Sequence, residues 1–434
     1  MAADLVSELR DFLDRSPTPY HAVHQAQTLL EAAGFRRLLE EEAWQLSPGD
    51  RVYVTRADAS IAALIVGQQP AAESGFRLIG AHTDSPNLRV KPHADLTRAG
   101  YQQLGVEVYG GVLLSTWLDR DLSLAGRLMV ERDGQLKPVL IDLQRPIARI
   151  PNLAIHLNRT VNSEGLKLNA QAHLPPVIAL SDTQTPVNLE SLIAEALRAK
   201  GPEYAQATVY GFDLCFYDVQ KATIAGTHGE FIHSARLDNL MGCFAALKPI
   251  LDARTATPFT RGIVLYDHEE VGSRSAQGAD STFLEQLLLR LSTAQGAAGP
   301  EALPRALARS FFISCDTAHA IHPNYQEMHD GNHSPRLGRG PVVKRHSSQS
   351  YATDGESSAR FALWCRQAEV TPQQFVTRSD LGCGSTIGPI SAARLGFRTI
   401  DVGHPLLSMH SIREMGAVAD VGLMNRVLTA YFSS

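Results

Sequence analysis

VLYDHEEVGS, the stretch at residues 264–273, joins an apolar run to two adjacent carboxylates and a glycine turn. Such a run is typical of a buried strand that carries ionised groups at its exposed end. Adjacent residues on a regular strand point to opposite faces, so Glu269 and Glu270 can share a site only if the strand ends or bends there, which Gly272 favours. We interpret the pair as a metal ligand beside a catalytic base. The alternative is a solvated acidic turn that caps a strand.

Segments with helix and strand patterns alternate on both sides of this stretch. Upstream, the spacing of apolar residues predicts two helices and then three strands, the third ending near His82. Downstream, the pattern predicts helices at 239–251, 281–294 and 418–432 and strands at 262–267, 311–315 and 399–403. Because such alternation is typical of a sheet covered on both faces, we predict an α/β fold with a mixed sheet flanked by helices.

The segment 93–232 has a different sequence pattern. It is rich in short strand-like runs punctuated by glycine or Asp-Gly, such as 105–111 and the run 128–140. We therefore expect an inserted β-rich domain at 93–232, with residues 1–92 and 233–434 sharing one α/β domain.

Composition excludes several classes of function. The 434 residues carry a formal net charge of −5 and contain no dense basic tract, so we expect no nucleic-acid partner. The N-terminus lacks the features of a signal peptide and no run is long enough to span a bilayer, so we expect a cytoplasmic protein with no membrane partner. The five cysteines are scattered and form no CxxC pair, so neither a disulfide framework nor a thiolate zinc site is indicated.

Five places carry histidine nitrogen or carboxylate oxygen, the ligands that metallohydrolases deliver from separate strand ends. They are His82 with Asp84, Asp238, the Glu269–Glu270 pair, Asp316 and His410. Each has a plain alternative, since a lone histidine at a strand end is more often structural, and Asp238 or Asp316 can cap a helix. Four of the five, however, follow or lie close to a predicted strand of one α/β domain, where strand ends converge on a crevice. Together they indicate a metal centre.

The motif His82-Thr83-Asp84 adds a finer argument. A metal-bound imidazole usually donates its second N–H to a carboxylate, which fixes the tautomer and raises the basicity of the ligand. Asp84 is placed to do this for His82.

Five long stretches occur in the order GAHTDSPNLRVKP at 80–92, RLDNL at 236–240, DHEEVGS at 267–273, GSTIGPI at 384–390 and MHSIRE at 409–414. Together they closely resemble the aspartyl aminopeptidase family of co-catalytic zinc metallopeptidases. The resemblance covers essentially the whole chain.

The resemblance implies two zinc ions per subunit. His82 and Asp316 would hold one ion, Glu270 and His410 the other, and Asp238 would bridge the two. Such a bridge suits metals roughly 3.5–4 Å apart. Ligation by histidine and carboxylate also accepts cobalt or manganese.

The resemblance also implies a role for the remaining carboxylates. Glu269 would be the general base that takes a proton from the attacking water and later passes it to the leaving amine. Asp84 would orient His82.

The family uses a histidine donated by a neighbouring subunit, and here the matching segment, 150–159, contains His156. Without the resemblance, His156 would be read as a plain polar residue in a strand. With it, the β-rich domain is expected to mediate self-association into a homo-oligomer, a tetrahedral dodecamer in such enzymes, and His156 to bind the substrate or stabilise the oxyanion across the interface.

Specificity for an N-terminal Asp or Glu requires a cation in the side-chain pocket, because a buried carboxylate without a partner is costly. Lys344 matches the family position for that cation, and His319 and Tyr351 match substrate-contacting positions. The segment RHSSQS at 345–350 adds basic groups that could alter the pocket.

The leading hypothesis is therefore a dinuclear metalloaminopeptidase that removes an N-terminal acidic residue from peptides, with Glu269 as base. One alternative keeps the dinuclear site but accepts neutral or varied N-terminal residues. A second, from a different class, is a catalytically silent assembly protein.

Overall fold

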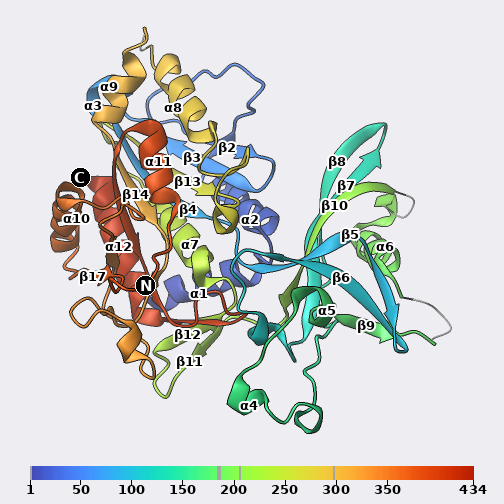
Figure 1. Ribbon diagram of the computed structural model, residues 1–434. Coiled ribbons are helices and arrows are strands. Elements are labelled where there is room, and N and C mark those ends of the chain that lie inside the picture. The colour runs from blue at the N-terminus through green and yellow to red at the C-terminus, as the bar shows by residue number, and fades with distance from the viewer. Residues whose placement is uncertain (1, 183–186, 205–206, 297–298) are drawn as a thin grey trace. The chain divides into compact units, whose positions relative to one another are not determined.

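The computed structural model describes residues 2–182, 187–204, 207–296 and 299–434 (Figure 1). The chain divides into two compact units. Unit 1 comprises Met1–Asp84, Ala222–Met409 and Glu414–Ser434, and unit 2 comprises Ser85–Lys221 and His410–Arg413. The limits predicted for the inserted domain, 93 and 232, lie inside unit 2 at one end and inside unit 1 at the other.

Within the described residues, unit 1 contains a nine-stranded mixed sheet in the order β1-β2-β3-β13-β4-β14-β18-β16-β17. The strands are β1 (Arg36–Arg37), β2 (Arg51–Arg56), β3 (Ser60–Ile65), β4 (Phe76–His82), β13 (Thr260–Tyr266), β14 (Phe311–Cys315), β16 (Val342–Arg345), β17 (Gln373–Val376) and β18 (Arg398–Gly403). The central strands β13, β4, β14 and β18 run parallel to their neighbours in that order. Every residue of β13 is buried, as expected for a strand covered on both faces.

Helices cover both faces of this sheet. Alternate residues of β13 belong to different apolar cores: Ile263 and Leu265 pack on one side, Val264 and Tyr266 on the other. The first core is closed by α1 (Ala2–Asp14), α2 (Pro19–Ala32), α7 (Leu237–Asp252), α10 (Gly355–Gln367) and α12 (Val418–Ser433). The second is closed by α3 (Ala71–Ser74), α8 (Phe283–Ala294), α9 (Ala302–Ala308) and α11 (Ile387–Leu395). The predicted α/β fold with a mixed sheet and flanking helices is confirmed.

Two small sheets complete the strands described in unit 1. They comprise β11 (Thr223–Ala225), β12 (Phe231–Ser234) and β20 (Glu414–Ala417), and β15 (Ala318–His319) with β19 (Pro405–Leu406). Because β12 pairs with β20 along its whole length, the residues from Ala222 to Ser234 belong to unit 1.

Unit 2 is built on an antiparallel sheet. In the part of the chain that the structure describes, its order is β8-β7-β10-β5-β6-β9. The elements are β5 (Asn87–Arg98), β6 (Tyr101–Tyr109), β7 (Leu122–Arg132), β8 (Gln135–Asp142), β9 (Val177–Leu180) and β10 (Thr208–Asp218), with helices α4 (Val161–Glu164), α5 (Ala170–His173) and α6 (Leu189–Lys200). The buried face of α6 packs in the core of this sheet, and its N-terminus is capped by the side chain of Asn188.

None of the helices in the described ranges combines the length and the apolar character needed to cross a membrane. The cytoplasmic location expected from the sequence stays a prediction.

Candidate metal centre

The candidate ligands of unit 1 lie at the carboxyl ends of adjacent parallel strands. His82 is the last residue of β4, Asp316 directly follows β14, and the acidic turn follows β13. The register places Tyr266 of β13 opposite His82 of β4. The strand ends therefore bring together side chains that are far apart in the sequence.

His82 is the centre of this group. Its Nε2 atom lies 3.4 Å from Asp316 Oδ1 and 3.5 Å from Asp238 Oδ1. All three side chains are buried. Glu270 completes the cluster, since His82, Asp238 and Glu270 each present one ligand atom and these atoms lie within 4.8 Å of one another.

Asp84 holds the opposite edge of the His82 ring. His82 Nδ1 lies 3.0 Å from the Asp84 carbonyl oxygen and 3.4 Å from Asp84 Oδ1. The same carboxylate accepts the backbone N–H groups of Glu269 and Glu270, each at 3.1 Å. Asp84 therefore contacts both the histidine and the backbone of the acidic turn.

The acidic turn breaks the alternation of β13. The strand ends at Tyr266, His268 adopts a left-handed conformation with φ of 64°, and a short 3-10 helix spans Glu269–Val271. The strand thus ends before the two glutamates. His268 has structural partners, with Nδ1 at 2.7 Å from Ser275 Oγ and Nε2 at 3.4 Å from Asp267 Oδ2.

Asp238 is positioned by contacts that sequence reasoning missed. Its backbone N–H donates to the buried carboxylate of Glu414 at 2.9 Å, and the peptide bond to Asn239 is cis. The Asn239 amide donates in turn to the carbonyl oxygen of Cys315, the last residue of β14, at 2.9 Å. Asn239 and Glu414 are not among the predicted site residues. Both lie in motifs quoted above, at 236–240 and 409–414, but only the fold shows what they contact.

A glycine allows β18 to approach this site closely. A Cβ atom on Gly403 would lie 1.7 Å from the carbonyl oxygen of Asp316. A larger residue would therefore displace the backbone that carries the ligand.

The cluster concentrates negative charge. Burial, and then the carboxylates of Asp316, Asp84 and Asp238, raise the pKa of Glu269 to about 8 against the opposing influence of His82. Burial and the adjacent Asp238 likewise raise the pKa of Glu270 well above its usual value.

The pKa of His82 shifts in the direction opposite to the effect of burial. Burial alone would lower its pKa, but hydrogen bonds with Asp238, Asp316 and Asp84 hold the pKa well above the ordinary value. The site thus stabilises positive charge at its centre.

Lys344 also borders the cluster. It is 2% exposed, and its Nζ atom donates to the Thr317 carbonyl oxygen at 3.0 Å and lies 3.4 Å from Asp316 Oδ2. The ammonium group also lies 5.1 Å from the centre of the Tyr351 ring. Lys344 is therefore a buried cation beside a candidate metal ligand, whereas its sequence surroundings are those of a surface lysine.

A neighbouring pocket holds two of the predicted substrate residues. His319 and Tyr351 line a hollow of about 300 Å³ together with Phe375 and Met409. Burial raises the pKa of Tyr351, so its hydroxyl stays protonated at neutral pH.

The remaining two predicted residues belong to unit 2. His410 Nδ1 lies 3.0 Å from the carbonyl oxygen of Gly111. His156 lies in the 3-10 helix Ile155–Leu157, where no residue is buried. The other six residues predicted for metal binding or catalysis all belong to unit 1 and lie together in the cluster described above, which Lys344 borders. They are His82, Asp84, Asp238, Glu269, Glu270 and Asp316.

The donor set fits a divalent cation. Five carboxylates gather here, and the cations described around them are His82 and Lys344. Buried carboxylates repel one another, so a cation among them removes a large electrostatic cost. Imidazole nitrogen with carboxylate oxygen is the ligand set of catalytic zinc.

Comparisons with known proteins agree with this chemistry. The family described as "Aminopeptidase I zinc metalloprotease (M18)" matches residues 12–432. The "Probable M18 family aminopeptidase 2" of Stutzerimonas stutzeri (strain A1501) is 50% identical over 434 residues, which is 100% of this chain and 99% of the relative.

Two solved structures have folds similar to that of this chain. The cryo-EM structure of the Ape4 and Nbr1 complex is similar with a TM-score of 0.94 and 37% identity, covering 99% of this chain and 86% of the other. The S. cerevisiae mApe1 dodecamer is similar with a TM-score of 0.85 and 31% identity, covering 99% and 96%.

Proposed function

The chain belongs to the M18 family of zinc aminopeptidases, and from that premise we propose that it removes an N-terminal Asp or Glu from peptides. The observation that carries the proposed hydrolysis is the acidic turn after β13. One of its glutamates, Glu270, presents a ligand atom within 4.8 Å of those of His82 and Asp238. The carboxylate of Asp84 accepts the backbone N–H groups of both Glu270 and its neighbour Glu269.

We assign two zinc ions to each subunit. His82 and Asp316 would hold one ion and Glu270 and His410 the other, and Asp238 would be a ligand of both. The approach of both Asp238 and Asp316 to His82 Nε2 supports the first part of this assignment. His410 is assigned on its motif alone, and cobalt or manganese are possible substitutes.

Bound zinc would polarise the scissile carbonyl and lower the pKa of the attacking water. Glu269 accepts a proton from the attacking water and delivers it to the leaving amine. Asp84 keeps the Glu269 backbone in place by accepting its N–H.

The preference for acidic substrates rests on Lys344. Its buried ammonium group has three donors, one of which is used by the Thr317 carbonyl oxygen. We propose that it also attracts the side-chain carboxylate of the substrate, with Tyr351 and His319 lining the adjacent pocket.

A second candidate is favoured by the ion pair of Lys344. Since its Nζ lies 3.4 Å from Asp316, the lysine can serve as a counter-ion for the metal ligand alone. The enzyme would then be an aminopeptidase of broad or neutral specificity.

We further propose self-association through unit 2, into a dodecamer as in the mApe1 structure. Three apolar side chains around His156 support an interface, since Leu153, Ile155 and Leu157 are 61%, 47% and 75% exposed. His156 would then reach the substrate of a neighbouring subunit.

The decisive experiment compares Glu269→Gln with Glu270→Gln. We expect the first variant to lose turnover by about 100-fold or more while keeping the zinc content of the wild type. The second should lose bound zinc, measured by elemental analysis on the same samples. Near-normal turnover of Glu269→Gln on aspartyl, glutamyl and leucyl substrates would refute the assignment of the base.

A further inference from the structure

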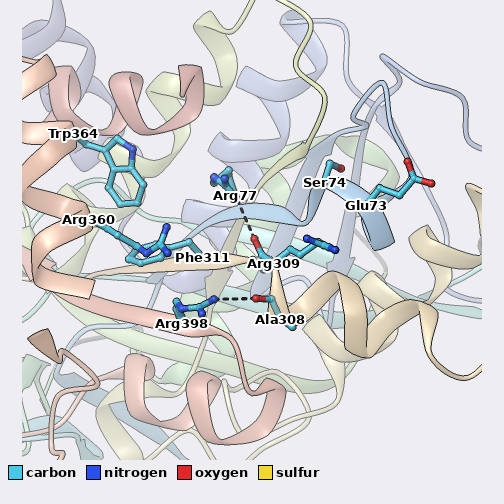
Figure 2. Close-up of a pocket in the computed structure, with 10 residues that line it drawn as sticks. Glu73, Ser74, Arg77, Ala308, Arg309, Phe311, Arg360, Trp364 and Arg398 are labelled. Carbon is cyan, nitrogen blue, oxygen red and sulfur yellow. Dashed lines mark hydrogen bonds between the residues drawn. The ribbon is translucent and has the colours of Figure 1, made fainter. Parts of the chain in front are cut away.

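A second polar hollow of unit 1 lies at the opposite ends of the strands that carry the metal centre (Figure 2). Its volume is about 360 Å³, and its lining includes Arg77 near the start of β4, Phe311 at the start of β14 and Arg398 at the start of β18. His82 lies five residue steps along the extended strand from Arg77, which is roughly 17 Å. The hollow is therefore distinct from the metal centre.

Four guanidinium groups line this hollow, those of Arg77, Arg309, Arg360 and Arg398. The carboxylates are Glu73 in the lining and Glu356, which pairs with two of the arginines. The hollow thus carries an excess of positive charge in a chain whose formal net charge is −5.

Two of the arginines are held by carbonyl oxygens rather than by carboxylates. Arg77 Nη1 lies 3.4 Å from the carbonyl oxygens of Phe76 and Arg309, and Arg309 Nε donates to the Ala72 carbonyl oxygen at 3.2 Å. Arg77 Nε is buried without a hydrogen-bond partner in the described part of the chain. These contacts fix the guanidinium groups without neutralising their charge.

The other two arginines share one oxygen atom. Glu356 Oε1 accepts from Arg360 Nη2 at 2.8 Å and from Arg398 Nε at 2.9 Å, and Arg398 Nη1 donates to the Ala308 carbonyl oxygen at 2.9 Å. One carboxylate between two cations leaves a net positive charge. The Arg360 and Arg398 side chains are 48% and 46% exposed, so a ligand can reach them.

The wall beside the arginines is aromatic. Phe311 and Trp364, which are 3% and 9% exposed, pack edge to face with ring centres 4.9 Å apart, and both contribute to the lining of the hollow. A site that joins guanidinium groups to an apolar wall favours a ligand with an anionic end and an apolar end.

We propose that this hollow binds a small organic phosphate. A phosphate monoester carries close to two negative charges at neutral pH and has three acceptor oxygens, which suits the excess positive charge and the guanidinium donors of the hollow. The phosphate group lies on the arginines and its organic part lies against Phe311 and Trp364. This inference is independent of the substrate preference proposed above.

Calorimetric titration of the zinc-loaded enzyme with phenyl phosphate, at constant ionic strength, tests the site. The double variant Arg360→Gln/Arg398→Gln should weaken binding by roughly tenfold or more. Glu356→Gln should strengthen it, because the two arginines lose their competing carboxylate. Arg366→Gln, an exposed arginine on the same helix α10 but outside the hollow, is the matched control and should bind as the wild type does.

Equal binding by the double variant and the control would overturn the proposal, as would the absence of saturable binding to the wild type. A parallel titration with inorganic phosphate tests the apolar part of the site. Phenyl phosphate should bind several-fold more tightly, and equal affinities would overturn the role of Phe311 and Trp364. Unchanged peptidase activity of all three variants verifies that each has folded.

Discussion

The side-chain carboxylate of Asp84 accepts the backbone N–H group of Glu269, with 3.1 Å between Asp84 Oδ1 and Glu269 N. Its second oxygen accepts the N–H of Glu270 at the same distance, and Oδ1 also lies 3.4 Å from His82 Nδ1. A single buried carboxylate therefore fixes the proposed base and two proposed ligands relative to one another.

Replacing Asp84 by Asn should lower activity by about 10- to 100-fold. An asparagine side chain has only one acceptor oxygen, so it can keep one of the two backbone N–H groups and must present an NH₂ group to the other. We expect the acidic turn to shift and zinc affinity to fall with it. Measuring kcat/KM together with zinc affinity tests this.

Asp95→Asn is a suitable control for that variant. Asp95 also accepts a backbone N–H, that of Leu189 at the start of α6, but it lies in unit 2, whereas Asp84 lies in unit 1. Equal losses in the two variants would mean that Asp84 acts only on general stability.

The sequence predicts much of this site because its residues follow buried strands. Periodicity places a strand at 311–315, which is where β14 lies, and the acidic pair directly after another. It does not predict that Asp84 contacts the Glu269 backbone, because that contact joins segments 185 residues apart. The pairing of β12 with β20, which assigns residues 222–234 to unit 1, is hidden for the same reason.

Lys344 illustrates a different limit of sequence reasoning. The sequence around Lys344 is typical of a surface lysine, and only the packing around β16 shows that its ammonium group is buried beside Asp316. A buried charge is costly without a partner, so the burial of Lys344 indicates a role in the site.

Replacing Lys344 by Gln should change substrate preference. If its ammonium group binds the substrate carboxylate, kcat/KM for aspartyl and glutamyl substrates should fall by about 100-fold, and that for a leucyl substrate only by a few-fold. The measurement is the ratio of the rate constants on the three substrates, with zinc content determined in parallel.

A parallel fall on all three substrates, with lower zinc content, would instead identify Lys344 as a counter-ion of Asp316. Lys248→Gln is the control, since Lys248 pairs with Glu8 and Asp252 elsewhere in unit 1.

Replacing Leu157 by Asp should weaken self-association. Leu157 is 75% exposed beside His156, and a charge placed in a buried interface is costly. Light scattering after size exclusion should detect smaller species, and activity should fall with them if His156 serves a neighbouring subunit. Leu136→Asp, at a 59% exposed position on β8 of the same unit, should leave the assembly intact. Full activity of a dissociated Leu157→Asp variant would contradict the shared site.

His404 links stability to pH. It is 2% exposed, and burial lowers its pKa from 6.5 to about 4. Between these two values the unfolded chain binds a proton that the folded chain does not. The contribution of neutral His404 is therefore fully present above pH 6.5 and is lost as the pH falls toward 4, at a cost of about 3 kcal/mol.

Replacing His404 by Asn removes this titration, so the free energy of unfolding of the variant should decrease less between pH 7 and pH 4.5 than that of the wild type. Because one pKa unit corresponds to about 1.4 kcal/mol, the difference between the two decreases should be about 2–3 kcal/mol. Urea denaturation of both proteins, each treated with chelator so that metal release does not contribute, measures it. His24→Asn, at an exposed position of α2, is the control and should follow the wild type. If the decreases in the His404 variant and the wild type coincide, protonation of His404 does not drive the acid sensitivity of the fold.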